Sequence, residues 1–376
     1  MMRILITGGA GFIGSHTADA LLARGHEVRV LDSLEEPVHP GRRVPDYLDR
    51  RVEFMRGDVR DEATLLRALQ DQDAVYHLAA FQDYLPQFSR FVDVNVASTA
   101  RIYELALREK LPLRRVIVAS SQATLGEGLY LDADGRRCLP DMRPDAQLRR
   151  GVFECQAPAG FRGPLRWQPT DEGVANPQNP YGMSKIAEEQ FALRLGERYG
   201  IPTVAMRYSI VQGPRQSFHN AYSGACRVFS LAAHQRIAPP IYEDGMQVRD
   251  FVNVHDVVDA NLLVLEDPRS DYEMFNVGGD RAMTVLDFAG VVAEVFGTTD
   301  LPRRPSGKYR FGDTRHICSD VSKLKALGWR PRRGVLDSVG EYRRWLDTAE
   351  DPGRILEECQ KLMERLQVVR PVEVGS

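Results

Sequence analysis

Short apolar runs alternate with amphipathic segments through the first half of the chain. Short apolar runs are typical of buried strands, and amphipathic segments are typical of helices. The expected strands are residues 3–7, 28–31, 52–55, 74–78, 115–119 and 203–208. The expected helices are residues 12–24, 61–69, 91–109 and 181–198. This alternation predicts βαβ units and a parallel sheet, with ligands at the carboxyl ends of the strands.

The regular pattern breaks down between Gly126 and Pro180, where Pro, Gly, Arg and Asp are frequent. A connection of this length without secondary structure is uncommon in a compact domain and is usually functional. The segment is therefore interpreted as a long loop insertion. After Gly213 the segments are shorter and less regular, which indicates a smaller second lobe. Residues 352–366 have the pattern of a peripheral amphipathic helix.

Composition and charge exclude several classes of protein. The 376 residues are 43% hydrophobic and 27% charged, so the chain can bury a sizeable core. The 49 basic and 52 acidic residues leave a net charge of −3, so no nucleic acid is expected as a partner. No membrane partner is expected either, because no apolar run reaches the roughly 18 residues of a span. The five cysteines are scattered and the first residues do not resemble a secretion signal, which predicts a cytoplasmic location.

A glycine-rich turn follows the first expected strand. Residues 7–14 read Thr-Gly-Gly-Ala-Gly-Phe-Ile-Gly and open the first expected helix. Gly8, Gly11 and Gly14 suit a tight turn, close approach of the backbone to a pyrophosphate, and close packing of helix on strand. The N–H groups at the start of the helix attract phosphate. The turn therefore predicts a dinucleotide site.

Two acidic residues extend this site. Asp32 ends the second expected strand, where a carboxylate accepts the 2′- and 3′-hydroxyls of the adenosine ribose. A carboxylate there repels a 2′-phosphate, so NAD is expected rather than NADP. Asp58 ends the third expected strand and is expected at the adenine amino group, with a turn-forming surface aspartate as the other interpretation.

A tyrosine and a lysine stand four residues apart at the start of the helix after the insertion. Tyr181 and Lys185 therefore share one face of that helix. The ammonium favours the phenolate, so the pKa of Tyr181 is expected to move from about 10 toward neutral. This makes Tyr181 a general base, with Lys185 also able to hold the nicotinamide ribose.

Taken together, these motifs resemble a known family. The residues that carry the resemblance are Thr7 to Gly14, Asp32, Asp58, His77-Leu78-Ala79-Ala80, Asn95, Ser120-Ser121 and Tyr181 to Lys185. Residues 1–347 resemble the extended short-chain dehydrogenase/reductases, and more narrowly their branch of nucleotide-sugar epimerases and dehydratases. The fold that this implies is α/β: a Rossmann-type, doubly wound parallel sheet with a smaller C-terminal α/β substrate lobe.

The resemblance also implies how the chain is divided. An NAD-binding Rossmann domain is expected over residues 1–210, including the insertion 126–180. A mainly substrate-binding lobe is expected over residues 211–347, with some segments that return to the first domain, and a helix and tail over residues 348–376. The family further implies a homodimer through the helices near residues 95–107 and 181–195. The apolar residues of these helices fit packing on the sheet of a monomer equally well.

The expected site residues follow from the same resemblance. Ser121 resembles the catalytic Ser or Thr of the family, so Ser121, Tyr181 and Lys185 are the expected catalytic residues. Asn95 resembles the residue that supports the Tyr–Lys proton network, although a surface asparagine is the other interpretation. The expected cofactor contacts are Gly8, Gly11, Phe12, Ile13, Gly14, Asp32, Asp58, Val59, Leu78, Ala79, Ala80, Asn95, Tyr181, Lys185 and Tyr208. The expected substrate contacts are Gln82, Ser121, Gln122, Asn220, Arg249 and Arg310.

The two residues that follow Ser121 help to distinguish between the reactions of the family. The dehydratases that this chain resembles carry an acid–base pair there, Asp-Glu, whereas this chain has Gln122 and Ala123, which exchange no proton at neutral pH. The simplest remaining chemistry is a 4-epimerase, in which bound NAD oxidises C4 of a sugar and returns hydride to the opposite face. A 4,6-dehydratase and a keto-sugar reductase are the alternatives. A non-catalytic NAD-binding regulator is disfavoured because Ser121, Tyr181 and Lys185 are intact.

The implied substrate is a nucleotide-diphosphate sugar. Arg249 and Arg310 resemble two family arginines that bind the diphosphate, a role that suits the planar guanidinium. Structural ion pairs are the other interpretation of both residues. Ile210 stands where the family often has an asparagine in contact with the substrate, so the base and the sugar stay open.

Residues 120–128 and 208–218 are similar to a subgroup of deoxysugar 4-epimerases of the dTDP-L-rhamnose type. Members of that subgroup often carry a Cys-rich, zinc-like insertion. The insertion of this chain has only Cys138 and Cys155 and no histidine. Because a structural zinc needs four such ligands, no metal is expected.

Overall fold

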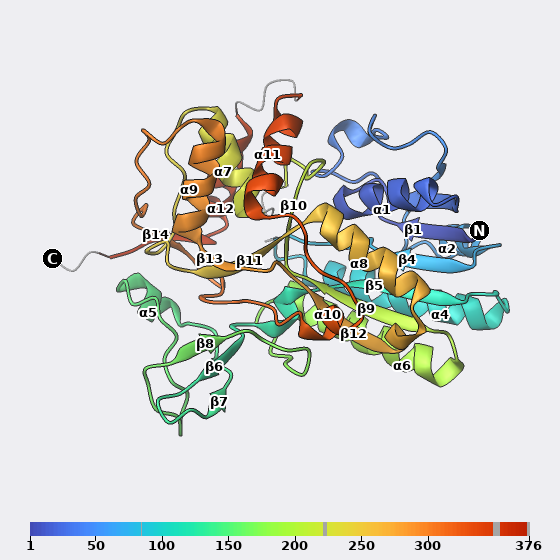
Figure 1. Cartoon of the computed structure of the whole chain (residues 1–376), viewed down its shortest axis with the longest axis horizontal. Helices are drawn as coiled ribbons and strands as arrows, with labels where there is room; N and C mark the ends of the chain where they lie inside the picture. Colours follow the sequence, from blue (N-terminus) through green and yellow to red (C-terminus); the bar gives the residue numbers. More distant parts are fainter. Residues whose placement is uncertain (84, 221–223, 349–353, 374–376) are drawn as a thin grey trace.

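The chain folds around a parallel sheet of seven strands, in a computed structural model that describes residues 1–83, 85–220, 224–348 and 354–373. The strands are β1 (Arg3–Thr7), β2 (Glu27–Asp32), β3 (Glu53–Arg56), β4 (Ala74–His77), β5 (Arg115–Ser121), β9 (Thr203–Tyr208) and β12 (Glu273–Val277). Their order across the sheet is β12-β9-β5-β4-β1-β2-β3, and every neighbouring pair is parallel (Figure 1). The predicted α/β doubly wound fold is confirmed. The strand β12, which the pattern did not predict, comes from the second half of the chain.

Helices cover both faces of this sheet. They are α1 (Phe12–Ala23) and α8 (Val254–Glu266) on one face, and α2 (Glu62–Leu69), α4 (Ser98–Arg108) and α6 (Pro180–Tyr199) on the other. Successive strand residues point to opposite faces, so Ile4 and Ile6 of β1 join one core and Leu5 joins the other. A sheet buried on both sides needs such continuous apolar runs, which is why six of its seven strands were predictable.

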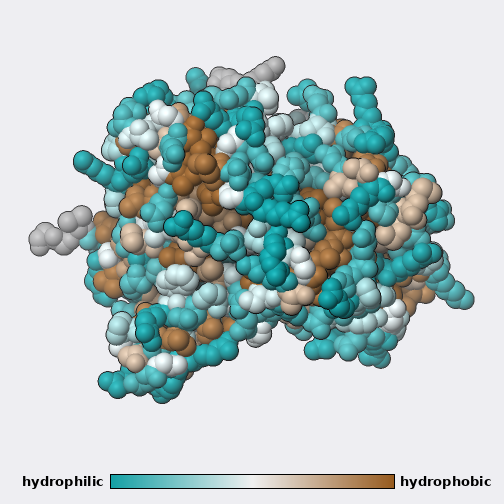
Figure 2. Space-filling view, viewed as in Figure 1, coloured by the Kyte–Doolittle hydropathy of each residue, from teal (hydrophilic) through white to brown (hydrophobic). Residues whose placement is uncertain are grey.

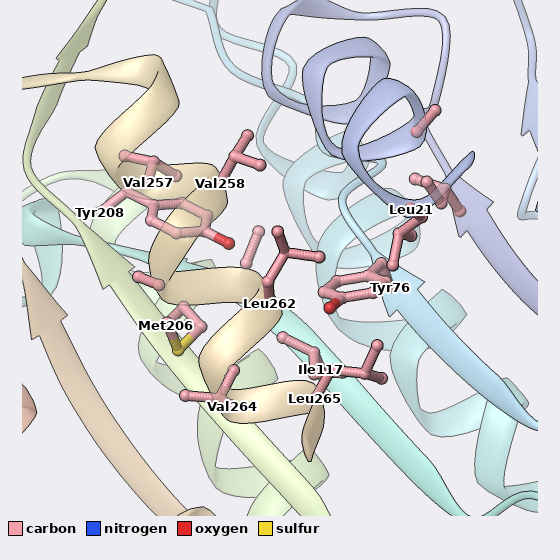
Figure 3. Packing of buried hydrophobic residues seen from close by; sticks show 14 of the residues in the cluster. Leu21, Tyr76, Ile117, Met206, Tyr208, Val257, Val258, Leu262, Val264 and Leu265 are labelled. Atoms are coloured by element: carbon pink, nitrogen blue, oxygen red, sulfur yellow. The ribbon is translucent and has the colours of Figure 1, made fainter. Parts of the chain in front are cut away.

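The core beneath α8 contains two tyrosines with satisfied hydroxyls. Figure 3 shows Leu262 of α8 close to Tyr76 and Ile117 of the sheet. The hydroxyl of Tyr76 donates to the Asn261 carbonyl (2.8 Å), and that of Tyr208 donates to Asn261 Oδ1 (2.7 Å). Both polar tips are therefore bonded within an apolar core, which fixes α8 on the sheet.

The expected helix over residues 91–109 is in fact three consecutive pieces. A short helix α3 (Phe88–Phe91) leads into a wide, π-helical stretch (Val92–Ala97), and α4 follows. The wide stretch contains Asn95, whose carbonyl accepts a bond from the Thr99 hydroxyl at 2.8 Å. Apolar spacing does not distinguish such a stretch from a regular helix, and wide turns of this kind are frequent at functional sites.

The insertion has secondary structure of its own, so the prediction of a loop is wrong. It contains β6 (Leu129–Leu131), β7 (Arg137–Cys138), β8 (Arg166–Gln168) and the helix α5 (Asp145–Arg149). The three strands form an antiparallel sheet in the order β7-β6-β8, at the lower left of Figure 1. Tyr130, Cys138 and Cys155 are buried in its small core, and Trp167 packs against them. Strands of two or three residues are too short to give a periodic signal.

Within the described residues, the C-terminal lobe is built from small sheets and four helices. Its elements are β10 (Ile210–Gln212), β11 (Val248–Asn253), β13 (Ala282–Thr284), β14 (Lys308–Arg310), β15 (Val369–Pro371), α7 (Ala225–His234), α9 (Val285–Phe296), α11 (Val335–Leu346) and α12 (Ile355–Arg365). The helix expected from residue 352 begins at Ile355 in the described part, and residues 352 and 353 lie outside it. Leu356 and Met363 of α12 are buried, and β15 pairs with β14, so this tail is part of the lobe. Two other segments, β12 and the short α10 (Ser322–Ala326), belong to the central sheet and its flank.

The surface seen in Figure 2 is mostly hydrophilic. Apolar groups gather over α7 and α9 and, separately, over α8. Within the described ranges, no helix is long and apolar enough to cross a membrane.

A buried set of charges joins the insertion to the C-terminal lobe. Arg143 of the insertion lies 3.1 Å from Glu127 and 2.9 Å from Glu243 of the lobe, and Glu243 is 3.0 Å from Arg315. All four side chains are at most 2% exposed. Arg143 also donates to the carbonyl of Asp313 at 2.7 Å. A buried charge is tolerated only when it is paired, so this quartet ties the two parts to each other.

Replacing Arg143 with methionine should therefore destabilise the fold strongly. The variant leaves Glu127 and Glu243 short of a buried partner, which costs about 3–5 kcal/mol of unfolding free energy. Chemical denaturation followed by circular dichroism measures the difference. The matched control is Arg137→Met, because Arg137 pairs with Asp171 on the surface of the same insertion and should lose less than about 1 kcal/mol. Equal losses in the two variants would contradict the role of the quartet.

Candidate active site

A cavity of about 1250 Å³ is lined both by the carboxyl ends of the sheet strands and by the C-terminal lobe. It brings together every predicted site residue except Asn95. Those that line it are Gly8, Gly11, Phe12, Ile13, Gly14, Asp32, Asp58, Val59, Leu78, Ala79, Ala80, Gln82, Ser121, Gln122, Tyr181, Lys185, Tyr208, Asn220, Arg249 and Arg310. Residues far apart in the sequence thus share one site, at the strand ends where the fold class predicts it.

The glycine-rich turn leaves space that a side chain would fill. Gly8 has φ of 69°, and a Cβ there would lie 2.7 Å from the backbone nitrogen of Ala79. A Cβ on Gly14 would lie 2.5 Å from the carbonyl oxygen of Gly8. Gly11 precedes α1, and no side chain caps its first N–H groups. The turn therefore fits a dinucleotide pyrophosphate, which takes the space beside unprotected N–H donors.

Asp32 is held rigidly at the end of β2. Its carboxylate accepts bonds from the backbone N–H groups of Ala10 (3.0 Å) and Leu34 (2.9 Å), and it is 8% exposed. Burial raises the pKa of Asp32, while the nearby His39 and the two N–H groups lower it. A carboxylate fixed in this way can select for ribose hydroxyls, and its discrimination against NADP stays a prediction.

Asp58 lines the same part of the cavity but is engaged with an arginine. Its Oδ2 lies 2.6 Å from Arg60, whose guanidinium is also 3.4 Å from Glu35. Arg90 pairs with Glu35 and lies over the ring of Phe81. The contact of Asp58 with adenine stays a prediction.

The three expected catalytic residues meet where β5 ends and α6 begins. Asn179 caps α6 through a bond from the Gly182 N–H (2.8 Å), which directs the first turn of the helix at β5. The phenol of Tyr181 is hydrogen-bonded to the hydroxyl of Ser121. The ammonium of Lys185 lies 5.9 Å from the centre of the Tyr181 ring. A hydroxyl, a phenol and an ammonium in this arrangement are suited to move a proton to and from a sugar hydroxyl.

Burial changes the expected acidity of Tyr181. In the chain alone, burial raises the pKa of the phenol above its usual value, although Lys185 and Ser121 both lower it. The expected shift toward neutral is therefore wrong for the chain by itself. Glu188 is one reason, because its carboxylate lies 2.6 Å from the Lys185 ammonium and acts on Tyr181 in the opposite direction.

Asn95 is buried behind the site rather than placed on the surface. Its amide nitrogen donates to the Ser184 hydroxyl (2.9 Å), and its oxygen accepts from the Phe81 N–H (2.7 Å). Ser184 in turn donates to the carbonyl of Tyr181 at 2.8 Å. Asn95 does not line the cavity, and it holds the start of α6 against the strand ends. Its contact with the cofactor stays a prediction.

The side chains of Gln122 and Tyr208 are hydrogen-bonded to buried groups of the protein. The amide nitrogen of Gln122 donates to Asp250, to Ser209 (3.2 Å) and to Ser319 (3.0 Å). Its oxygen is the atom left for the predicted substrate contact. The hydroxyl of Tyr208 donates to Asn261 in the core beneath α8, and the contact of Tyr208 with a cofactor stays a prediction.

Two arginines face the cavity from the C-terminal lobe. Arg249 of β11 lies 3.2 Å from Asp313 and donates to the carbonyl of Thr314 at 2.6 Å. Arg310 of β14 lies 4.0 Å from the same Asp313 and its guanidinium is above the ring of Tyr242. The two positive charges therefore share one carboxylate at the wall of the cavity, which suits a site for a diphosphate.

Comparison with known proteins agrees with this geometry. The family model described as "NAD dependent epimerase/dehydratase family" matches residues 4–141 and 155–278. This chain belongs to that family. It is 32% identical to a dTDP-L-rhamnose 4-epimerase of Burkholderia thailandensis over 92% of this chain and 94% of the relative. It is 28% identical to a UDP-glucose 4-epimerase of Lacticaseibacillus casei over 90% of this chain and 95% of the relative.

Solved structures of this epimerase/dehydratase family are similar in fold. The UDP-glucose 4-epimerase of Thermotoga maritima with UDP-glucose has a TM-score of 0.73 and 28% identity, covering 92% of this chain and 99% of that one. The UDP-glucose 4-epimerase of Thermus thermophilus with NAD has a TM-score of 0.71 and 27% identity, covering 93% and 100%. The predicted family, its NAD cofactor and its epimerase relatives are confirmed.

Several cavity residues of this family member were not predicted from the sequence. Met142 and Gln178 reach the cavity from the insertion, and Tyr242 and Gln247 reach it from the C-terminal lobe. No periodic signal marks these positions. Glu188 does carry a signal, since a residue three positions after Lys185 lies on the same helix face. In the part of the chain that the structure describes, no three His, Cys, Asp or Glu side chains are grouped to hold a metal.

Tyr181→Phe should keep the fold and the cofactor but remove most of the turnover. The variant keeps the buried ring and deletes only the hydroxyl bonded to Ser121. We expect turnover to fall by roughly 10² or more. Turnover is measured with nucleotide-sugar substrates, and the amount of co-purified NAD is measured by mass spectrometry. Unchanged turnover would place the base elsewhere, and loss of NAD would mean that the hydroxyl serves binding.

Proposed function

We propose that this chain is a nucleotide-diphosphate-sugar 4-epimerase that oxidises C4 transiently and returns hydride to the opposite face. The observation that carries the proposal is the group of Ser121, Tyr181 and Lys185, followed by Gln122 and Ala123. The first three residues supply the proton chemistry of an alcohol oxidation. The next two supply no acid or base for the elimination of water.

The roles of the catalytic residues follow from their contacts. Tyr181 removes the proton of the C4 hydroxyl, and Ser121, already bonded to the phenol, orients that hydroxyl and shares the proton. Lys185 stabilises the phenolate by its charge and is placed to hold the nicotinamide ribose. NAD, when bound on the glycine-rich turn, supplies the hydride acceptor and donor. Since hydride returns to the same sugar, the net reaction consumes no cofactor.

Gln122 supports epimerisation over dehydration. Its amide nitrogen bonds to three buried acceptors, so the side chain is held and carries no titratable proton. Ala123 offers no polar atom. A dehydratase needs an acid and a base over the carbons that lose water, and these two positions provide neither.

The proposed substrate is anchored at its diphosphate. Arg249 and Arg310 would pair with the phosphate oxygens, which replace their shared partner Asp313. Asn220 and Gln82 line the cavity and are proposed as further contacts. Anchoring at the diphosphate leaves the sugar able to rotate beneath the nicotinamide.

We propose a 6-deoxyhexose of the dTDP-L-rhamnose kind as the first sugar to test. The relative that acts on dTDP-L-rhamnose is 32% identical to this chain, while the UDP-glucose 4-epimerases are 28% identical or less. The insertion also adds one apolar side chain, Met142, to the wall of the cavity. An apolar wall suits a sugar that carries a methyl group in place of a hydroxymethyl group.

We further propose a homodimer in the cytoplasm. The helices α4 and α6 lie side by side, and they expose large apolar side chains at Met183 (54%), Phe191 (47%) and Leu107 (41%). A second copy that packs on this face would bury them. All five cysteines are unpaired thiols, which supports a reducing compartment.

The epimerase reaction is tested by the fate of hydrogen at C4 and C5. Incubation of dTDP-L-rhamnose or UDP-glucose with the enzyme in deuterated water should give the C4 epimer, without added cofactor. No deuterium should enter at C4 or C5, because hydride returns from the bound cofactor. Nuclear magnetic resonance of the product measures both. Deuterium at C5, or a stable 4-keto-6-deoxy product formed from UDP-glucose, would establish a dehydratase or a multi-position epimerase instead.

The dimer is tested by one charge on the exposed face of α6. Phe191→Glu should convert the protein from dimer to monomer, because a carboxylate at a buried apolar contact is strongly disfavoured. Light scattering coupled to size exclusion measures the mass. Leu336→Glu is the control, since Leu336 is 53% exposed on α11 of the other lobe and should leave the mass unchanged. A wild-type mass of one chain would refute the homodimer.

A further inference from the structure

The ammonium of Lys185 is paired with a carboxylate from its own helix. Lys185 Nζ and Glu188 Oε2 are 2.6 Å apart, and the two side chains are 1% and 0% exposed. The second oxygen of Glu188 is buried without a hydrogen-bond partner among the described residues. This pair lies directly behind the group proposed to bear the chemistry, and the roles given above to Ser121, Tyr181 and Lys185 do not include Glu188.

The other groups around this pair are already neutral or occupied. On β4, the ring nitrogens of His77 bond to Thr7 (2.7 Å) and Ser98 (2.9 Å), and burial lowers the pKa of His77 to about 3. On α4, the hydroxyl of Tyr103 bonds to Thr203 at 2.9 Å. Neither residue brings a charge to the pair.

The neighbouring carboxylate is likewise committed elsewhere. Glu189 lies 2.7 Å from Arg207 of β9 and accepts a bond from the Ser120 hydroxyl at 2.9 Å. Its charge is balanced by Arg207. Glu188 is therefore the carboxylate that balances Lys185.

The positive charge of Lys185 acts on both Tyr181 and Glu188. A lone ammonium would favour the phenolate of Tyr181, and an adjacent carboxylate weakens that effect. Burial raises the pKa of Glu188 to about 7, and Lys185 opposes this rise. Protonation of Glu188 near neutral pH would restore the full effect of Lys185 on Tyr181.

We propose that Glu188 is a positioning residue for Lys185, which holds the ammonium beside the site and offsets its charge at Tyr181. The proposal rests on the proposed roles of Tyr181 and Lys185. It has two separable parts. The length of the side chain sets where the ammonium lies, and its charge sets how readily Tyr181 loses its proton.

The charge is tested by Glu188→Gln, which keeps size and hydrogen bonding. Removal of the negative charge lowers the pKa of Tyr181, so the rise of turnover with pH should move to lower pH by about one unit. At a pH between the two midpoints the fraction of full turnover should rise several-fold, and the two acid limbs should converge at low pH, where Glu188 is protonated in the wild-type enzyme as well. Wild-type enzyme should show a shallower acid limb, because Glu188 and Tyr181 titrate together. An unchanged midpoint and slope would overturn the proposal.

The position is tested by Glu188→Asp, which keeps the charge but shortens the side chain. This variant should keep the wild-type midpoint and lose several-fold in maximal turnover, because the ammonium is drawn away from the site. Glu197→Gln is the matched control on the same helix, since Glu197 pairs with Arg194 at the surface, also three positions away. It should change neither the midpoint nor the maximum. Full turnover in Glu188→Asp would overturn the positioning role.

A measurement without substrate separates this proposal from the proposed function. The ionisation of Tyr181 is followed as the ultraviolet difference between the purified enzyme and its Tyr181→Phe variant during a pH titration. The same difference is recorded in the Glu188→Gln background. We expect the phenolate to form at lower pH by about one unit when Glu188 is neutral. Equal titrations would overturn the proposal even if the enzyme proves to be a 4-epimerase, and a shift would support it whatever the reaction.

Discussion

The ion pair between Glu189 and Arg207 connects the helix that carries Tyr181 to the strands beside it. The guanidinium bonds to both carboxylate oxygens, at 2.7 and 2.8 Å, and both side chains are at most 1% exposed. Arg207 also donates to the carbonyls of Glu172 and Val174, and Glu189 accepts from Ser120. One buried pair thus connects α6, β5, β9 and the return of the insertion. Together with the bond of Asn95 to the start of α6, this pair fixes the separation between the tyrosine on α6 and the serine on β5.

The proposed substrate end depends on a different set of charges. Arg249 and Arg310 meet at Asp313, whose carbonyl also accepts a bond from Arg143 of the insertion. The insertion therefore supports the segment that carries Asp313, the shared partner of the two arginines proposed to bind phosphate, and it also lines the cavity through Met142. The insertion therefore has a structural role that does not involve a metal. Its core of Tyr130, Cys138 and Cys155 is apolar and closed, which suits packing better than ligation.

Much of the nucleotide end could be predicted because local chemistry and long-range geometry coincide there. A run of glycines after an apolar strand has few folded solutions, and Tyr181 with Lys185 is fixed by helix spacing alone. The insertion could not be predicted, since its strands are too short for a period. The hydrogen bonds of the Tyr208 hydroxyl and of the Gln122 amide could not be predicted either, because their partners, Asn261 and Asp250, come from distant segments. The acidity of Tyr181 was mispredicted because the spacing rule counted Lys185 and omitted burial and Glu188.

The pairing of β14 with β15 has a consequence for how the protein is made. Arg310 is the last residue of β14, and it stands opposite Val369, close to the end of the described chain. The glycine-rich turn, by contrast, is complete within the first few strands. During synthesis from the amino end, the cofactor half can therefore begin to fold long before the wall that carries Arg310 has its partner strand. The central sheet also needs β12, so both the sheet and the wall that carries Arg310 are completed only by late segments of the chain.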